Sequence, residues 1–195
     1  MTSEFPVVPI SNPIFDALAI GQSIWYDNVR RSLISSGQLT RMVSEDGLRG
    51  VTSNPSIFDK AIAGSIDYEE ALADIRQRRN LDARLAYEEL AFADISAAAD
   101  ILHTVYDASS RQDGYVSIEV PPYLAHDASG TVKEAARIWE AIDRPNLMVK
   151  VPATAEGIVA FRALIRRGIN VNVTLLFSVQ IYEEVAKAYI GGLSD

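Results

Sequence analysis

The 195-residue chain has no cysteine and only two histidines. Without cysteine there is no disulfide framework, no thiolate nucleophile and no zinc site built on Cys ligands. His103 and His126 lie far apart in the sequence, so we expect no metal cage built on histidine. Neither histidine has a partner pattern that indicates catalysis. We therefore predict a protein without a bound metal.

Basic stretches and long apolar runs are also missing. Lys and Arg number 18 against 26 Asp and Glu, for a formal charge of -8, and no stretch offers a basic path to nucleic acid. No run approaches the length of a membrane-spanning helix, and the start, MTSEFPVVPISNP, lacks a basic segment followed by an apolar core. We expect a soluble, cytoplasmic protein without nucleic-acid or membrane partners.

The composition is that of a globular protein. The chain is 48% hydrophobic, and no low-complexity stretch, Ser/Gly linker or charge block marks a boundary. We predict a single domain over residues 1–195.

The first half of the chain is mostly helical in pattern. Apolar residues at helical spacing over 25–34 predict a helix that Gly37 ends, and a short helix is expected over 39–45. The run GVTSNPS, 50–56, predicts a strand that leads into a loop at Asn54, because a residue before proline avoids the helical region. Two amphipathic helices are expected over 68–75 and 87–105.

From Gly114 onward, strands and helices alternate regularly. This alternation predicts βαβ units on a parallel sheet with right-handed crossovers, which is the α/β class. The expected strands are YVSIEV, LMVKV and INVNVTLLF, and the expected helices cover 132–142, 157–166 and 179–189.

Polar residues at period two are the informative deviation in these strands, because a buried parallel strand is normally apolar on both faces. In each strand one face is apolar, and the other carries Glu119, then Lys150, then Asn172 and Thr174. The apolar faces can cover helices. We therefore expect the four polar side chains to converge on the opposite face, as they would inside a closed parallel barrel.

Lys150 is the group with the clearest chemistry. An ammonium taken out of water either pairs with a carboxylate or releases its proton. A neutral amine on a rigid strand can attack a carbonyl to form a Schiff base, whose cationic nitrogen accepts electrons from a breaking carbon-carbon bond. Glu119 could move protons through a water. Asp27, after the run SIWY, could protonate or deprotonate a substrate hydroxyl.

Each of these residues also has a structural interpretation. Lys150 could form a salt bridge with the carboxylate of the preceding strand. Asp27 could cap a helix, which is a common use of aspartate, and Asn54 could shape a turn before proline. Asn172 and Thr174 could be polar packing groups.

Five segments together resemble transaldolases, in the longer bacterial variety with a SNPSIF loop. They are GQSIWYDNVRRSL, GLRGVTSNPSIFDKAI, YVSIEVPPYLAHD, NLMVKVPATAEGI and GINVNVTLLFS, in this order. The resemblance implies a (β/α)8 TIM barrel of the Schiff-base aldolase type. It also implies an enzyme of the pentose phosphate pathway that needs no cofactor. Such an enzyme transfers a dihydroxyacetone unit from sedoheptulose 7-phosphate or fructose 6-phosphate to glyceraldehyde 3-phosphate or erythrose 4-phosphate.

The resemblance also implies a role for each matching residue. Lys150 would form the Schiff base, Glu119 and Thr174 would hold the catalytic water, and Asp27 would be the general acid/base on the C4 hydroxyl. Three further residues would bind the hydroxyls of the donor sugar: Thr52, Asn54 and Asn172.

One departure from the family matters for activity. The family continues with three more barrel strands, which carry the serine and arginines for the substrate phosphate, whereas this sequence ends at GGLSD. We expect about five of eight strands, with two open edges that favour pairing with another chain. The isolated piece is then expected to be inactive unless a second chain completes the barrel. Alternatives are a related aldolase without acceptor transfer and a noncatalytic half-barrel that self-associates through its edges.

Overall fold

The computed structural model describes residues 12–63, 65–78 and 82–195. Five parallel strands form one sheet in the order β1-β2-β3-β4-β5, so each strand pairs with its neighbours in the sequence. This confirms the predicted α/β class, and it is the arrangement expected of part of a TIM barrel. The strands are β1 (Trp25–Asp27), β2 (Gly50–Thr52), β3 (Tyr115–Glu119), β4 (Leu147–Pro152) and β5 (Val171–Thr174).

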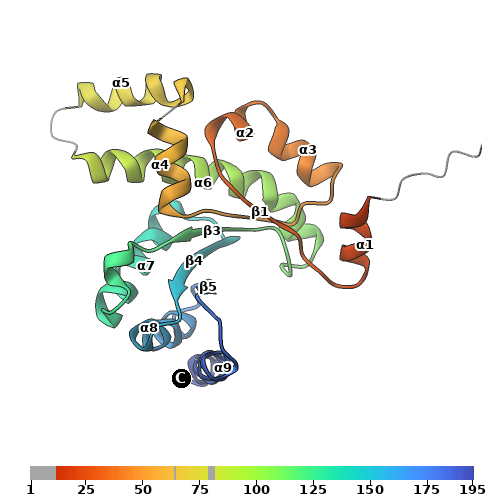
Figure 1. The fold of residues 1–195 in the computed structure, drawn as a ribbon, viewed down its shortest axis with the longest axis vertical. Helices are drawn as coiled ribbons and strands as arrows, with labels where there is room; N and C mark the ends of the chain where they lie inside the picture. Colours follow the sequence, from red (N-terminus) through yellow and green to blue (C-terminus); the bar gives the residue numbers. More distant parts are fainter. Residues whose placement is uncertain (1–11, 64, 79–81) are drawn as a thin grey trace, which may run out of the picture.

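Helices follow the strands and lie around the outside of the curved sheet (Figure 1). The longest, α6, has 26 residues, and no described helix has both the length and the sustained apolar character that a bilayer span requires. The α-helices are α1 (Pro13–Ala19), α2 (Arg31–Ser35), α3 (Gln38–Ser44), α4 (Pro55–Ala63), α5 (Glu69–Gln77), α6 (Ala83–Ala108), α7 (Ala128–Ile142), α8 (Ala155–Arg166) and α9 (Val179–Ser194). Two short 3₁₀ turns are η1 (Ile66–Tyr68) and η2 (Pro122–Leu124).

The main core lies between the sheet and these helices. The apolar faces predicted for β3 and β4 are buried there, with Val116, Leu147 and Val149 fully covered. Helix α6 supplies a run of alanines and larger apolar residues to the same cluster. Burial of this face fixes which way the strands present their polar residues, because side chains alternate along a strand.

Helices α7 and α8 begin at residues whose side chains cap them. Asp127 accepts a hydrogen bond from the Gly130 N–H at 2.9 Å at the start of α7, and Thr154 accepts one from the Gly157 N–H at 3.0 Å at the start of α8. Such caps satisfy backbone donors that the first helical turn leaves unpaired. They also fix the loops between the carboxyl ends of the strands and the helices.

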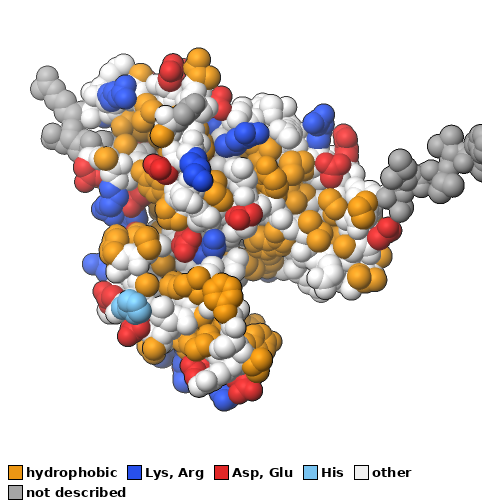
Figure 2. Space-filling model, in the orientation of Figure 1, with side chains coloured by type: hydrophobic (Ala, Val, Ile, Leu, Met, Phe, Trp, Pro, Cys, Tyr) orange, Lys and Arg blue, Asp and Glu red, His pale blue; other side chains and the backbone are white. Residues whose placement is uncertain are grey.

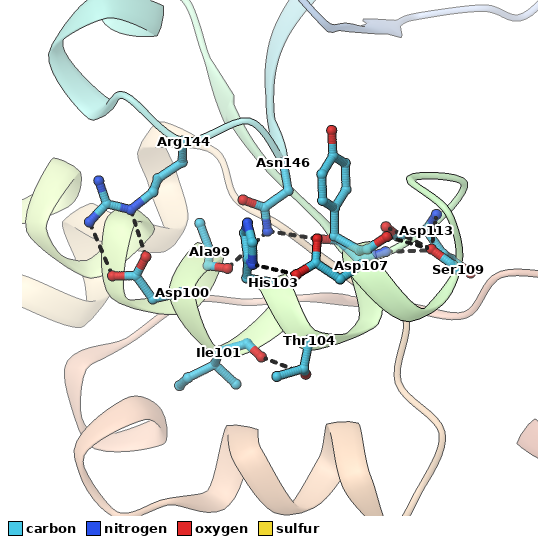
Figure 3. Close-up of polar contacts among 12 residues, drawn as sticks. Ala99, Asp100, Ile101, His103, Thr104, Asp107, Ser109, Asp113, Arg144 and Asn146 are labelled. Carbon is cyan, nitrogen blue, oxygen red and sulfur yellow. Dashed lines mark hydrogen bonds and ion pairs between the residues drawn. The ribbon is translucent and has the colours of Figure 1, made fainter.

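At the amino ends of the strands, a polar cluster joins α6 to β3 and β4 (Figure 3). The Nδ2 of Asn146 donates to the carbonyls of Ala99 and Gly114 at 2.8 and 2.9 Å, and Asn146 is fully buried. His103 lies 3.3 Å from Asp107 on the same helix. His103 therefore sits at the opposite end of the sheet from the polar residues predicted to act together.

One secondary-structure prediction was wrong in part. Trp25 and Tyr26 lie in β1, and the helix begins only at Arg31. The indole of Trp25 lies over Gly50, its register partner, where an added Cβ would come within 2.3 Å of the ring. The helical spacing of the apolar residues over 25–34 was too short a pattern to predict the structure here, because residues 25–27 are stabilised as a strand by pairing with β2.

One side of the molecule is open between α1 and α9, and Figure 2 shows a notch there, with apolar side chains gathered over α8 and α9 below it. In the described part of the chain β1 and β5 are the edge strands. Large exposed apolar residues cluster after β5 and on α9: Leu175, Phe177, Val179, Tyr182, Ile190 and Leu193.

Candidate active site

The polar residues form staggered rows on the sheet face opposite the apolar one. Strand register places Asp27 beside Thr52 in one row. It places Glu119, Lys150 and Asn172 side by side in the next row, nearer the carboxyl ends. Register partners in a parallel sheet share a face, so the convergence predicted from the sequence follows from this pairing. The stagger is the one that a closing barrel requires.

The amine of Lys150 lies in the sheet interior and makes two polar contacts. Its Nζ donates to the carbonyl oxygen of Ser53 at 2.9 Å and lies 3.7 Å from Glu119 Oε2. The lysine side chain is only 11% exposed, and the glutamate side chain 25%. Lys150 is therefore not turned outward under the helices. The salt bridge considered from the sequence exists, and it joins the two residues that the Schiff-base interpretation also needs.

Hydrogen bonds of Ser53 and Ser117 link the end of β2 to β3, next to the carbonyl that accepts from Lys150. The Ser53 hydroxyl donates to the Ser117 carbonyl at 2.9 Å, and the Ser117 hydroxyl donates to Thr52 Oγ1 at 2.9 Å. Both serines are fully buried. Sequence reasoning did not single out Ser53, although a serine between a strand and an Asn-Pro turn was a signal that could have found it.

Asp27 ends β1 and is exposed, and no hydrogen bond or ion pair to its carboxylate is seen within the described residues. The helix-capping interpretation of Asp27 was wrong, because α2 begins four residues later and its N-cap is Arg30. A carboxylate at the carboxyl end of a strand, without a structural partner, can reach a bound molecule at the barrel mouth.

The side chain of Asn54 makes the local hydrogen bonds that the turn interpretation of its position before proline predicted. Its Oδ1 accepts from the Ile57 N–H at 3.0 Å and from the Ser56 hydroxyl at 2.7 Å, so it caps the start of α4. The side-chain oxygen of Asn54 is thus already hydrogen-bonded within the protein, and the amide nitrogen is the group left to bind a substrate hydroxyl.

Thr174, at the end of β5, is different. Its Oγ1 is buried, and it has no hydrogen-bond partner among the described residues. Buried polar atoms are nearly always hydrogen-bonded in folded proteins, so an unpaired hydroxyl indicates a binding position for a water or a polar ligand group.

One tyrosine, Tyr87, lies close enough to Glu119 to be influenced by its charge. Tyr87, on α6, packs edge-on against Phe58 with ring centroids 6.1 Å apart. Burial, and then the nearby carboxylates, Glu119 foremost, raise the pKa of Tyr87 to about 12. The Tyr87 phenol thus keeps its proton to a higher pH than a free tyrosine does.

This pKa predicts an alkaline loss of stability. A tyrosine whose pKa is about 12 in the folded state and 10.0 when free holds its proton longer in the native state, so the free energy of unfolding should fall as the pH rises from 10 toward 12. Urea unfolding at about pH 9 and about pH 11 measures this fall. The fall should be smaller in Tyr87→Phe, and an equal fall in both proteins would contradict the assignment.

His126 lies in the loop before α7 and is 3.3 Å from Glu156 at the start of α8. The imidazole is 81% exposed. The pair joins the loop before α7 to the first turn of α8. The sequence had not indicated a partner for this histidine.

The sequence pattern of the family described as Transaldolase/Fructose-6-phosphate aldolase matches residues 24–194, which include all five strands. The chain belongs to this family. The family resemblance inferred from the five segments is confirmed, and so is the assignment of the parallel sheet to a TIM barrel of the family.

Curated transaldolases are among the relatives of this chain. The chain is 52% identical over 178 residues to the transaldolase of Thiobacillus denitrificans, covering 91% of this chain and 49% of the relative. It is 51% identical over 185 residues to transaldolase 2 of Nostoc punctiforme, covering 94% and 48%. It is 46% identical over 186 residues to the transaldolase of Saccharopolyspora erythraea, covering 95% and 50%. The chain thus spans about half the length of the curated relatives it matches.

Proposed function

We propose that this chain provides the Schiff-base half of a transaldolase site, which transfers a dihydroxyacetone unit between sugar phosphates. The observation that carries the proposal is the buried Lys150 amine, 3.7 Å from Glu119, on the face where the family's polar residues converge. The relatives' name supports the reaction type. The donors are sedoheptulose 7-phosphate or fructose 6-phosphate, and the acceptors are glyceraldehyde 3-phosphate or erythrose 4-phosphate.

In the first half of this reaction, Lys150 forms the covalent bond. Its neutral amine attacks the keto carbon of the donor, and the carbinolamine loses water to give an iminium ion. A water held by Glu119 and by the unpaired hydroxyl of Thr174 carries the protons of these steps. The donor's hydroxyls are bound by three residues on or next to the strand ends: Thr52, Asn54 and Asn172.

In the second half, Asp27 handles the proton of the substrate hydroxyl. Its carboxylate removes the proton from the C4 hydroxyl while the C3–C4 bond breaks and its electrons move to the iminium nitrogen as an enamine. The enamine then adds to the acceptor aldehyde, and Asp27 returns the proton to the new hydroxyl. Asp27 is exposed and has no partner among the residues that the structure describes. This position suits the exchange, because the carboxylate must meet two different sugars.

We further propose that residues 1–195 form one domain and that activity requires completion of the barrel. The open edges of β1 and β5 and the apolar residues on α9 support pairing with further strands. Self-association through these edges is the alternative use of the same surface. The cytoplasmic location expected from the sequence stays a prediction.

The test uses two proteins: this chain alone, and this chain joined to the part of the Thiobacillus denitrificans transaldolase that it does not match, here called the joined protein. Each is incubated with fructose 6-phosphate and borohydride, and the adduct is located by peptide mass spectrometry. We expect a reduced adduct on Lys150 and, in the joined protein, transfer of labelled dihydroxyacetone to erythrose 4-phosphate. Repeated release of glyceraldehyde 3-phosphate together with free dihydroxyacetone, without transfer, would instead indicate an aldolase. A folded joined protein without an adduct would show that Lys150 and Glu119 form only a structural ion pair.

A further inference from the structure

A closed ring of hydrogen bonds lies just outside the residues assigned above. The Arg31 backbone N–H donates to the Tyr68 hydroxyl at 3.0 Å, and that hydroxyl donates to Asp94 Oδ2 at 2.6 Å. The ring closes where Arg31 Nε donates to Asp94 Oδ1 at 2.9 Å. The same guanidinium lies 4.5 Å from the centre of the Tyr68 ring. Three separate elements, α2, η1 and α6, are joined in this way.

The ring is buried to a degree that is unusual for ionisable groups. Tyr68 is 0% exposed and Asp94 is 3% exposed. A buried carboxylate is costly unless its oxygens are hydrogen-bonded, and here each oxygen of Asp94 has one donor. Burial, and then the hydrogen bond to Asp94, raise the pKa of Tyr68, so the phenol keeps the proton that it donates. The proposed reaction uses none of these groups.

The ring fixes the first residue of α2, Arg31, through its backbone N–H and its guanidinium. Arg31 is the first residue of this helix, and the preceding Arg30 provides no side-chain cap. The Tyr68 hydroxyl therefore accepts from a backbone donor that the helix leaves unpaired. Val29, two residues earlier, is 1% exposed and is buried in the main core. The segment from 29 to 31 is thus fixed at both of its ends.

Asp27 lies two residues before this segment and four residues ahead of Arg31. Its carboxylate has no partner in the described part of the chain, so its position depends on the backbone on either side of it. On one side is the pairing of β1 with β2. On the other side is the segment that the ring fixes.

We propose that Tyr68 and Asp94 are positioning residues for Asp27, which hold the segment after β1 so that the carboxylate meets the substrate hydroxyl. This role rests on the proposed function. Misplacing a reacting group by about 1 Å can cost about a hundredfold in rate. The proposal predicts a defect in one half of the reaction only, because Lys150 and Glu119 lie on other strands.

The test compares Tyr68→Phe with Tyr106→Phe in the joined protein. Tyr68→Phe removes the bridging hydroxyl of η1. Tyr106, in contrast, lies near the carboxyl end of α6, the helix that carries Asp94, and packs edge-on against Tyr115 with centroids 5.4 Å apart. With Tyr68→Phe we expect the borohydride adduct on Lys150 to form at the normal rate while label transfer falls by about ten- to a hundredfold. Tyr106→Phe should change neither rate. Hydrogen exchange should show a faster-exchanging Arg31 amide in Tyr68→Phe only.

Asp94→Asn is the second variant, because its amide cannot accept both donors, and the same split between adduct and transfer is expected. Unchanged transfer in a variant with a faster-exchanging Arg31 amide would overturn the positioning role. Equal losses of adduct and transfer would also overturn it, since they would show a general structural effect. Absence of the adduct in the unsubstituted protein would overturn the proposed function itself and the positioning role with it.

Discussion

Replacing Lys150 by methionine should abolish the borohydride adduct and lower label transfer by at least about a thousandfold. The other lysines, Lys60, Lys133 and Lys187, lie on helices and not on the sheet face that carries Lys150. Methionine is close to lysine in length and fills the apolar part of its path through the sheet. The measurement is peptide mass spectrometry of the reduced joined protein, together with the rate of transfer. Far-ultraviolet circular dichroism checks that the variant retains its fold.

Lys133→Met is the matched control. Lys133 is an exposed residue of α7, so the same substitution there should leave adduct and transfer unchanged. An adduct that persists in Lys150→Met, or that shifts to another lysine without loss of transfer, would contradict the assignment of the nucleophile. Loss of transfer in Lys133→Met would show that the assay reports folding and not chemistry.

Substituting Gly157 by alanine should lower the free energy of unfolding by about 3 kcal/mol, the upper end of the usual cost of an added methyl group in a packed place. Alanine inside a helix is normally better than glycine by about 1 kcal/mol, so this expectation reverses the usual sign. The reason is that a Cβ at Gly157 would lie 1.9 Å from the carbonyl oxygen of Pro152, a main-chain atom that cannot turn aside. Urea unfolding measures the difference.

Gly191→Ala provides the comparison within the same chain. Gly191 also lies in a helix, α9, but the atoms nearest to its added Cβ belong to the end of the Arg162 side chain, at 3.0 Å, which can shift by a few tenths of an ångström. This variant should be unchanged or more stable by up to about 1 kcal/mol. Similar effects of the two substitutions would mean that the close approach of α8 to β4 does not limit the fold.

The second half of the fold was predictable because its strands and helices carry strong, regular patterns. The expected strands of 115–120 and 147–151 match β3 and β4 closely. The expected strand INVNVTLLF is longer than β5, which ends at Thr174 where the chain turns away toward α9. The first half was harder, because a strand of only three residues, such as β1, leaves too little pattern to outweigh a chance helical spacing.

The candidate site was predictable where polar residues interrupt apolar strands, and less so elsewhere. Lys150 and Glu119 stand out by period two, and the structure places them together. The ring that includes Asp94 was missed, although an aspartate in the middle of the mostly apolar run LAFADIS was a signal of a buried, paired charge. Its partners lie 26 and 63 residues away in the chain, so local spacing could not name them.

The contact from Lys150 to Ser53 uses a main-chain oxygen of β2's outgoing turn. Mutational scanning replaces side chains and leaves every main-chain carbonyl in place. A scan of this turn will therefore underestimate how much the Ser53 carbonyl contributes to the orientation of the Lys150 amine. Replacing the peptide bond between Ser53 and Asn54 by an ester would not isolate this contact. The ester weakens the Ser53 carbonyl as an acceptor and also removes the Asn54 N–H. A change in the path of the turn, such as a one-residue insertion before Pro55, is the perturbation that would move the acceptor away from the amine.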